Sequence, residues 1–248
     1  MERKEYKRLK DREQFFWWNV GRRAILREAL GRYIKSHDAN ILDVGCGPGG
    51  NILFLKEFGK VTGIDSSDEA LSFARAQGFH KIVKGDSEEL PFPDEAFDIV
   101  SILDVLEHID DDKKALDEIF RALKRNGVLL LTVPAYAWMW SDHDEALHHK
   151  RRYGHKELRG KILNAGFSIE EMSYFVIPAI PFRALKLCFE KLQGLFNKDK
   201  KKILKTDDVI LPPFLNSFFI AWLAVERYVM RIFPIPCGSS LLVVAKKP

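Results

Sequence analysis

Hydrophobic positions along the chain alternate between two spacings, which predict strands and helices in turn. Short apolar runs predict strands, and stretches with apolar residues three or four positions apart predict helices. Strands are expected at 40–44, 61–64, 81–84, 97–103, 128–133, 167–175 and 240–245. Helices are expected at 14–35, 51–58, 67–77, 111–124 and 155–165. This alternation indicates an α/β fold with a doubly wound, mostly parallel sheet.

The segment between Phe175 and Gly238 interrupts the alternation. It has 62 residues, is rich in aromatic residues, prolines and lysines, and is too long for a plain connection. A helix is expected at about 214–233, where an apolar stripe follows helical spacing. We therefore predict a single domain over residues 1–248. Its parts are a helical cover at 1–38, a core sheet at 39–175 and 238–248, and a helical insertion at 176–237.

The composition sets general limits only. The 248 residues are 46% hydrophobic and 30% charged, as in ordinary globular domains. Three widely spaced cysteines argue against a disulfide framework and for a reducing compartment. The first residues show no apolar run typical of a signal peptide, and prolines interrupt the longest uncharged stretch, 209–225. We therefore expect a cytoplasmic protein without a membrane-spanning helix.

The net charge of +4 is distributed unevenly. Residues 36–149 contain 10 basic and 22 acidic side chains, whereas residues 150–248 contain 18 basic and 8 acidic ones. The basic run Lys198–Lys202 and the apolar helix expected at 214–233 together fit an anionic membrane surface. Burial of that helix in the core, in a lid or in a homodimer is the alternative. No RNA-binding module is recognisable, so a nucleic-acid partner is not expected.

A glycine-rich loop, which runs from Asp43 to Gly50, joins the first strand to the next helix. Glycines allow the backbone to turn tightly and to approach a ligand closely. Gly45, Gly47 and Gly50 satisfy the G-x-G-x-x-G spacing, and Asp65 lies 20 residues after Gly45, which permits an NAD site. Asp43 argues against NAD, because a carboxylate there repels a pyrophosphate and favours a ligand with an ammonium and a sulfonium.

Two further motifs follow the third and fourth strands. They are Gly85-Asp86-Ser87-Glu88-Glu89-Leu90 and Leu103-Asp104-Val105-Leu106-Glu107-His108. With the glycine loop and Asp65, they make four ordered motifs within residues 39–135 that resemble class I S-adenosylmethionine (SAM)-dependent methyltransferases, especially the type 11 group. The resemblance implies a Rossmann-like sheet of seven strands with an antiparallel last strand. It also implies SAM as methyl donor and S-adenosylhomocysteine (SAH) as product.

The resemblance assigns parts of the cofactor to these motifs. The loop approaches the methionine part, Asp65 binds the ribose hydroxyls, and the motif after the third strand addresses the adenine. Arg22, on the N-terminal helix, either meets the methionine carboxylate or is an exposed helix arginine. The alternative for Asp65 is a helix cap or a turn. The expected cofactor-binding residues are Arg22, Asp43, Gly45, Cys46, Gly47, Gly49, Asp65, Ser66, Asp86, Ser87, Leu103 and Asp104.

Acceptor-binding residues are expected beyond the fourth and fifth strands. A hydroxyl acceptor needs a general base, most often a histidine or a carboxylate. The fourth strand leads to His108, and the loop that follows the fifth strand, 138–153, is rich in histidine. The expected catalytic residues are His108, His143, Asp144, His149, Arg152 and Tyr153.

The roles of these residues leave alternatives open. Either His143 or His149 is the base, oriented by Asp144, or Arg151 and Arg152 instead clamp an anionic acceptor such as a phosphate or a carboxylate. His108 is either a base or a structural histidine bonded to backbone. The spacing of His143, Asp144 and His149 is not a strong metal signature, so no metal is expected. A capped, solvated loop is the plainer interpretation.

We therefore expect methyl transfer from SAM to a small acceptor, or to one linked to a lipid or glycan, at oxygen. The lipid or glycan class rests on a resemblance of the run 140–167, with Arg22 and Arg23, to a subgroup associated with lipid-linked sugar pathways. The alternatives are a SAM-binding sensor or scaffold without catalysis and an NAD-dependent oxidoreductase.

Overall fold

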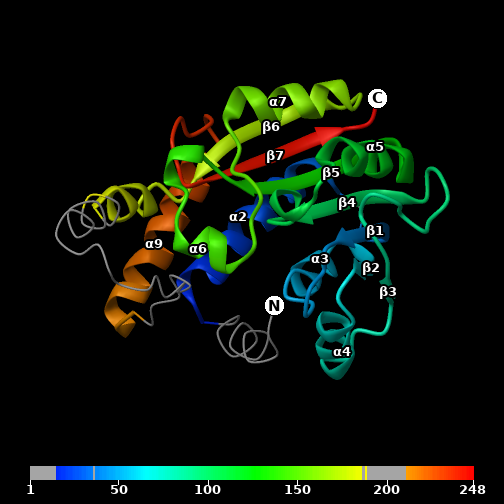
Figure 1. The fold of residues 1–248 in the computed structure, drawn as a ribbon, viewed down its shortest axis with the longest axis horizontal. Coiled ribbons are helices and arrows are strands. Elements are labelled where there is room, and N and C mark those ends of the chain that lie inside the picture. Colours follow the sequence, from blue (N-terminus) through cyan, green and yellow to red (C-terminus); the bar gives the residue numbers. More distant parts are fainter. Residues whose placement is uncertain (1–14, 36, 186–187, 189–210) are drawn as a thin grey trace, which may run out of the picture.

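The computed structural model describes residues 15–35, 37–185, 188 and 211–248, and it contains seven strands in one sheet (Figure 1). The strands are β1 (Ala39–Val44), β2 (Gly59–Asp65), β3 (Ile82–Lys84), β4 (Phe97–Leu103), β5 (Leu123–Pro134), β6 (Ser168–Phe175) and β7 (Ser240–Lys246). Their order is β3-β2-β1-β4-β5-β7-β6, and β7 runs antiparallel to both of its neighbours, β5 and β6. The predicted Rossmann-like sheet with an antiparallel last strand is confirmed.

Helices connect most of the strands and extend the fold. They are α2 (Trp17–Tyr33), α3 (Ile52–Leu55), α4 (Asp68–Ala76), α5 (Asp112–Ala122), α6 (Asp142–Ala146), α7 (His155–Asn164) and α9 (Pro213–Val229). Two 3-10 turns, η1 (Leu106–His108) and η2 (Ala137–Met139), follow β4 and β5. The predicted start of the first helix at residue 14 and the run Lys198–Lys202 lie outside the described residues.

The central strands are buried on both faces, which accounts for their largely apolar sequences. Every position of β1 except Asn40 is buried, and so is every position of β4 except Asp98. Apolar surface removed from water in this way stabilises the fold by about 25 cal/mol per Å². The packed sheet therefore fixes the place where each strand ends.

Two predicted helices are shorter in the structure. The helix predicted at 51–58 is reduced to α3, and the one predicted at 111–124 ends at Ala122. β5 begins immediately at Leu123, which pairs with Phe97 of β4, and the register shifts between Phe97 and Ile99. Pairing with a distant strand here overrides the local helical spacing.

α9, which belongs to the predicted insertion, packs against α2 (Figure 1). Asn216 of α9 accepts a hydrogen bond from Trp17 N and donates one to Phe15 O, at 2.9 Å each. These bonds satisfy backbone groups at the start of α2. Gly21 permits the close approach, since a Cβ there would lie 2.3 Å from Leu223 Cδ1. The described part of the insertion is therefore tied to the N-terminal helix.

α9 buries only one of its faces. Leu223 and Glu226 face the protein interior. Phe218, Trp222 and Val225, which belong to the predicted apolar stripe, are instead 53%, 41% and 62% exposed. The stripe thus faces outward, and the interior contact uses residues beside it. Among the described helices, none combines the length and the apolar character needed to cross a lipid bilayer.

Candidate functional site

The carboxyl ends of β1, β2 and β4 meet at one edge of the sheet, and the predicted cofactor motifs lie there. β1 lies between β2 and β4, so strand order reverses at this point, where sheets of this class bind ligands. The register places Asp43 of β1 beside Gly63 of β2 and Ser101 of β4. Motifs that are far apart along the chain are thereby brought to one place.

The loop after β1 requires glycine at two positions. Gly45 and Gly49 have φ angles of +67° and +100°, in the left-handed region that side chains disfavour. A Cβ at Gly45 would lie 2.4 Å from a methyl carbon of Val105, and one at Gly49 would lie 2.4 Å from the ring of Phe79. The loop therefore approaches its neighbours more closely than any side chain would allow.

Asp65, at the end of β2, fastens this loop. Its Oδ2 accepts a hydrogen bond from Gly47 N at 2.8 Å, and its Oδ1 accepts one from Ser67 N at 2.9 Å. Ser67 in turn caps α4 by accepting a hydrogen bond from Ala70 N. The turn role considered for Asp65 is therefore realised, and the ribose contact stays a prediction.

Asp43 has a buried carboxylate oxygen without a partner. Its Oδ1 accepts a hydrogen bond from Ser101 Oγ at 2.7 Å, whereas Oδ2 has no hydrogen-bond partner among the residues that the structure describes. Burial raises the pKa of Asp43 to about 7, although the bond from Ser101 opposes this shift. A cationic ligand would satisfy Oδ2 and favour the charged form. The site therefore fits the ammonium and sulfonium groups of SAM.

Cys46 lies in the same loop and is buried as well. Burial raises the pKa of its thiol, so the side chain stays neutral. Cys46 thus serves as an apolar part of the loop, and its predicted proximity to the cofactor stays a prediction.

Arg22 points from α2 into this edge of the sheet. Its side chain is 7% exposed, and its Nη2 lies 2.7 Å from Asp104 Oδ2. Nη2 also donates to Thr132 Oγ1 at 3.1 Å, and Nη1 donates to Asn51 Oδ1 at 3.2 Å. The alternative of an exposed helix arginine is therefore wrong. The contact with the methionine carboxylate stays a prediction.

The remaining predicted cofactor residues lie at the same strand ends. Leu103 is buried at the end of β4, and Ser66 is exposed directly after β2. Asp86 is exposed after β3, and its Oδ1 accepts a hydrogen bond from Glu88 N at 2.9 Å, with Ser87 half-buried between them. Their contacts with the adenine, the ribose and the methionyl group stay predictions.

Asp144 is the centre of a buried ion network on the acceptor side. α6 begins with a capping box in which Ser141 N donates to Asp144 Oδ2 at 2.9 Å. Asp144 Oδ1 accepts hydrogen bonds from Arg152 Nε at 2.7 Å and from His149 Nδ1 at 2.9 Å. Burial disfavours the charge on Asp144, but the bonds from His149 and Arg152 outweigh it and lower its pKa. Asp144 is thus a fixed anion that orients His149.

The network distinguishes among the predicted catalytic residues. The sequence predicted that Asp144 orients either His143 or His149, and the structure shows the contact with His149. The centroid of the His143 ring lies 6.5 Å from that of the His149 ring. Arg152 has a side chain that is 9% exposed, and it also donates to Ala135 O at 3.1 Å. Its guanidinium therefore supports Asp144 and is not presented to an anionic acceptor as predicted.

Tyr153 was predicted to contact the acceptor, but it lies in the protein interior. The side chain is fully buried, and its hydroxyl donates to Asp112 Oδ2 at 2.9 Å. Asp112 also pairs with Arg151 and with Lys161 of α7, at 3.0 Å and 2.8 Å. Tyr153 and Arg151 thus tie the loop after β5 to α5, and the predicted acceptor contact of Tyr153 is corrected.

Glu107, His108 and His149 lie together at the end of β4. The rings of His108 and His149 meet edge to face with centroids 4.7 Å apart, and His149 Nε2 lies 4.0 Å from Glu107 Oε1. Burial and the nearby Asp104 raise the pKa of Glu107 well above its ordinary value. Burial and the neighbouring His149 lower the pKa of His108 to about 4. His108 is therefore neutral at physiological pH.

Glu107 was not among the predicted site residues. Its sequence position also suits an acidic residue that interacts with the dipole at the start of a helix, which is a common arrangement. The available signal was its position between Asp104 and His108, directly after a strand. His108 itself is bonded to the backbone of His148, as its structural alternative stated.

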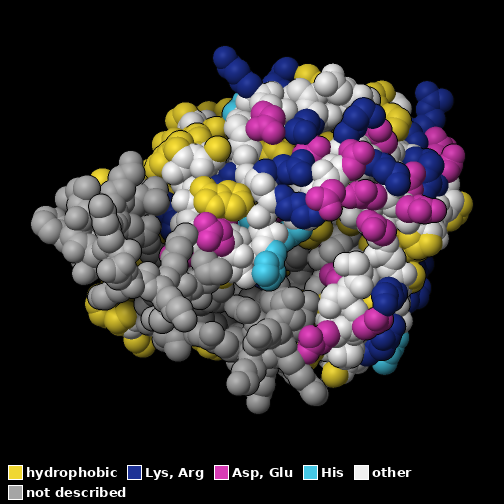
Figure 2. All heavy atoms as spheres, viewed as in Figure 1, with side chains coloured by type: hydrophobic (Ala, Val, Ile, Leu, Met, Phe, Trp, Pro, Cys, Tyr) yellow, Lys and Arg dark blue, Asp and Glu magenta, His cyan; other side chains and the backbone are white. Residues whose placement is uncertain are grey.

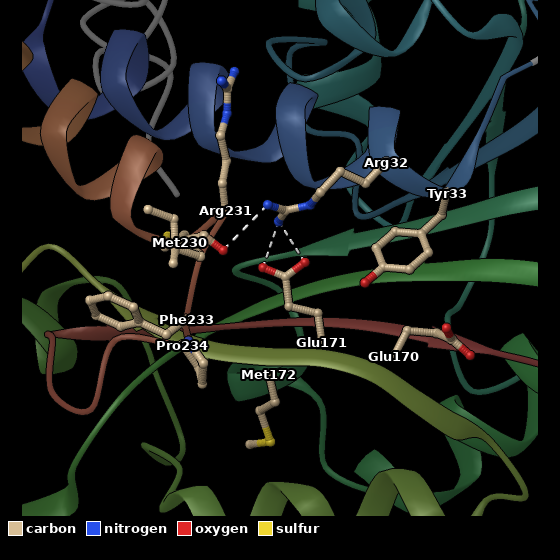
Figure 3. Close-up of a pocket in the computed structure, with 10 residues that line it drawn as sticks. Arg32, Tyr33, Glu170, Glu171, Met172, Met230, Arg231, Phe233 and Pro234 are labelled. Carbon is tan, nitrogen blue, oxygen red and sulfur yellow. Dashed lines mark hydrogen bonds and ion pairs between the residues drawn. The ribbon is translucent and has the colours of Figure 1, made fainter.

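A hollow of about 290 Å³ lies elsewhere, between α2, β6 and the segment after α9 (Figure 3). Arg32 points into it and contacts both carboxylate oxygens of Glu171 at 2.6 Å. Arg32 also donates to Met230 O at 3.4 Å. The charges of Arg32 and Glu171 neutralise each other, and we therefore assign no ligand to this hollow.

Comparisons with known proteins agree with the arrangement at the strand ends. Residues 42–131 match the family model described as a methyltransferase domain. A SAM-dependent methyltransferase of Mycolicibacterium smegmatis is 29% identical over 64% of this chain and 62% of its own length. A malonyl-acyl-carrier-protein O-methyltransferase of Enterobacter lignolyticus is 29% identical over 63% of this chain and 64% of its own. The chain thus spans less than two thirds of the length of these relatives.

A solved structure shares the fold. A SAM-dependent methyltransferase from Thermotoga maritima matches with a TM-score of 0.59, at 18% identity, over 98% of each chain. The family match begins within β1 and ends within β5, so it includes the glycine loop, Asp65 and Asp104. SAM is the cofactor of this family, which favours SAM over NAD at the glycine loop. Residues 42–131 therefore match the class I SAM-dependent methyltransferases of the type 11 group.

Proposed function

We propose that the protein transfers a methyl group from SAM to an oxygen atom of a small, lipid-linked or glycan-linked acceptor. SAM supplies the methyl group on a sulfonium. Because the departing thioether is neutral, the protein has to align the acceptor, exclude water and provide for the loss of a proton. The observation that supports the proposal most is the contact of His149 Nδ1 with the buried Asp144, next to His108 at the end of β4.

His149 has the features of a general base for a hydroxyl. Its Nδ1 donates to Asp144, which leaves the lone pair on Nε2. The neutral state of His108 adds no positive charge that would repel a sulfonium. An imidazole that a buried carboxylate orients is suited to accept a proton from a hydroxyl, which favours oxygen as the methylated atom.

Methyl transfer is tested with SAM that carries a radiolabelled methyl group, supplied to the small molecules and lipids of a lysate. We expect label in an acceptor with the parent protein and much less with Asp65→Ala. Without Asp65, the hydrogen bonds from Gly47 N and Ser67 N and the predicted ribose contact are lost. We expect SAH affinity to fall about 10- to 100-fold, as measured by calorimetry.

The control is Asp68→Ala, which removes an exposed acidic residue paired with Lys84 and should keep the parent SAH affinity. Unchanged affinity in Asp65→Ala would contradict the ribose role. SAH binding without any labelled acceptor would support the sensor or scaffold instead. NADH binding without SAH binding would support the oxidoreductase.

We further propose that the exposed face of α9 contacts an anionic membrane surface. Phe218, Val225 and Tyr228 are 53%, 62% and 61% exposed on it, a pattern typical of helices that lie at a lipid interface. On the face shown in Figure 2, by contrast, basic and acidic side chains are interspersed over α5 and α7, with pairs such as Lys113–Asp117. That face has no patch of uniformly positive charge to attract an anionic membrane. The exposed face of α9 is therefore the better candidate for the membrane contact.

Vesicle flotation tests this contact. We expect the parent protein to float with phosphatidylserine vesicles more than with phosphatidylcholine vesicles, and the double variant Phe218→Ser/Val225→Ser to lose most of this binding. Leu163→Ser, at a 39%-exposed position on α7, is the matched control. Equal flotation of the parent and the double variant would refute the proposal. A stable dimer in sedimentation that the double variant dissociates would assign the face to self-association.

A further inference from the structure

The strand-end cluster of Glu107, His108 and His149 has the geometry of a cation site. One ligand atom from each side chain lies within 4.8 Å of the other two. We propose that this Glu–His–His cluster binds a divalent first-row transition cation, such as Zn²⁺ or Mn²⁺. The sequence did not predict a metal, because the set considered for one was His143, Asp144 and His149, whose spacing is not a strong metal signature.

The donor set selects the class of cation. Two imidazole nitrogens and one carboxylate oxygen suit Zn²⁺, Mn²⁺, Fe²⁺ or Co²⁺. Mg²⁺ and Ca²⁺ prefer sites made entirely of oxygen. A transition cation is therefore expected to bind more tightly than Mg²⁺.

The state of Glu107 is the second observation that points to a ligand. Its side chain is fully buried, and neither carboxylate oxygen has a hydrogen-bond partner within the described chain. Buried carboxylates are ordinarily hydrogen-bonded or paired, because an isolated one is costly. A cation between Glu107 and the two histidines would satisfy both oxygens.

His149 is already oriented as a metal ligand would be. Its Nδ1 donates to Asp144 at 2.9 Å, so that Nε2 is directed toward Glu107. Metal-bound histidines usually donate their other ring nitrogen to a carboxylate or a carbonyl in this way. Bonds of about 2.1 Å to a single ion require the three ligand atoms to close together by about 1 Å. Side-chain rotations at His108 and Glu107 provide this movement.

The cluster joins the two sides of the site. Glu107 and His108 follow β4, whereas His149 belongs to the loop after β5, and Lys150 N donates to Glu107 O at 2.8 Å between them. Three protein ligands leave coordination positions open for an acceptor hydroxyl, whose proton the cation makes easier to lose to water. In that state the imidazoles act as ligands, and the cation replaces His149 as the group that activates the hydroxyl. This role rests on the proposed function, whereas cation binding itself does not.

Cobalt titration of the chelator-treated full chain tests the site. We expect one equivalent of Co²⁺ to bind with a visible absorption band from nitrogen and oxygen ligands, and Zn²⁺ to displace it. Glu107→Gln and His108→Ala should each lower the Co²⁺ affinity at least about 100-fold. His80→Ala, which removes an exposed histidine before β3, should bind Co²⁺ as the parent does.

SAH binding to the same samples separates this inference from the proposed function. Intact SAH binding without a Co²⁺ band, or a Co²⁺ affinity that Glu107→Gln and His108→Ala leave unchanged, would overturn the metal site alone. If the parent protein does not bind SAH, the proposed function is overturned, whatever the result of the cobalt titration. Circular dichroism shows whether each variant is folded, and the two separate variants guard against a folding defect in one of them.

Discussion

The variant His149→Ala is expected to slow methyl transfer by about 100-fold or more, the range ordinarily lost with a general base. His149 is 8% exposed and is held by Asp144, so its Nε2 has one orientation. Alanine removes that nitrogen and leaves the cofactor residues Arg22, Asp43 and Asp65 in place. SAH affinity should therefore stay within about twofold of the parent value.

Single-turnover rates with labelled SAM, together with SAH calorimetry, measure the two quantities separately. His80→Ala serves as the histidine control and should keep the parent rate. A rate within a few-fold of the parent would remove His149 from the reaction. The loss is the same whether Nε2 accepts the proton or binds a cation, and the cobalt titration distinguishes these roles.

Asp144→Ala is expected to destabilise the protein by about 3–5 kcal/mol, because it leaves the guanidinium of Arg152 buried without its carboxylate. Ser141 N and His149 Nδ1 lose their acceptor as well. The pKa of Asp144 is lowered in the folded state, so its contribution is complete at neutral pH. It is lost only as the pH falls below the ordinary range of an aspartate pKa.

Thermal unfolding at pH 7 measures this effect as a decrease in Tm of roughly 6–20 °C for a chain of this size. Asp110→Ala is the control, because Asp110 is 83% exposed and pairs with Lys150 at the surface. That change should alter stability by no more than about 1 kcal/mol. A loss below about 1 kcal/mol in Asp144→Ala would mean that the buried network is not what holds the loop after β5.

The sheet was predictable because its strands carry their own signal. β1 and β4 are buried on both faces, and most of their residues are apolar, although Asp43 and Ser101 are buried among them. The end of α5 was not predictable to the residue, since it depends on the pairing of Leu123 with Phe97, 26 positions away. Local spacing contains no information about such a partner.

The cofactor side of the site was more predictable from local sequence than the acceptor side. The glycine loop and Asp65 were recognisable from local spacing, because backbone conformation and strand ends decide their positions. The roles of Arg152, Tyr153 and Glu107 depend on which charges share the interior with them. Arg152 and Tyr153 resemble acceptor contacts in sequence, yet each is committed to a buried aspartate, Asp144 and Asp112 respectively.

The capping of α2 by Asn216 has a consequence for biosynthesis. Trp17 and Asn216 are 199 positions apart, so α2 leaves the ribosome long before α9 exists. At about 5–20 residues per second, the delay is on the order of 10–40 s. During this interval α2 lacks the partner that fixes its start, although β1 to β5 can already pair. The capped start of α2, the helix that carries Arg22, therefore forms only late in translation.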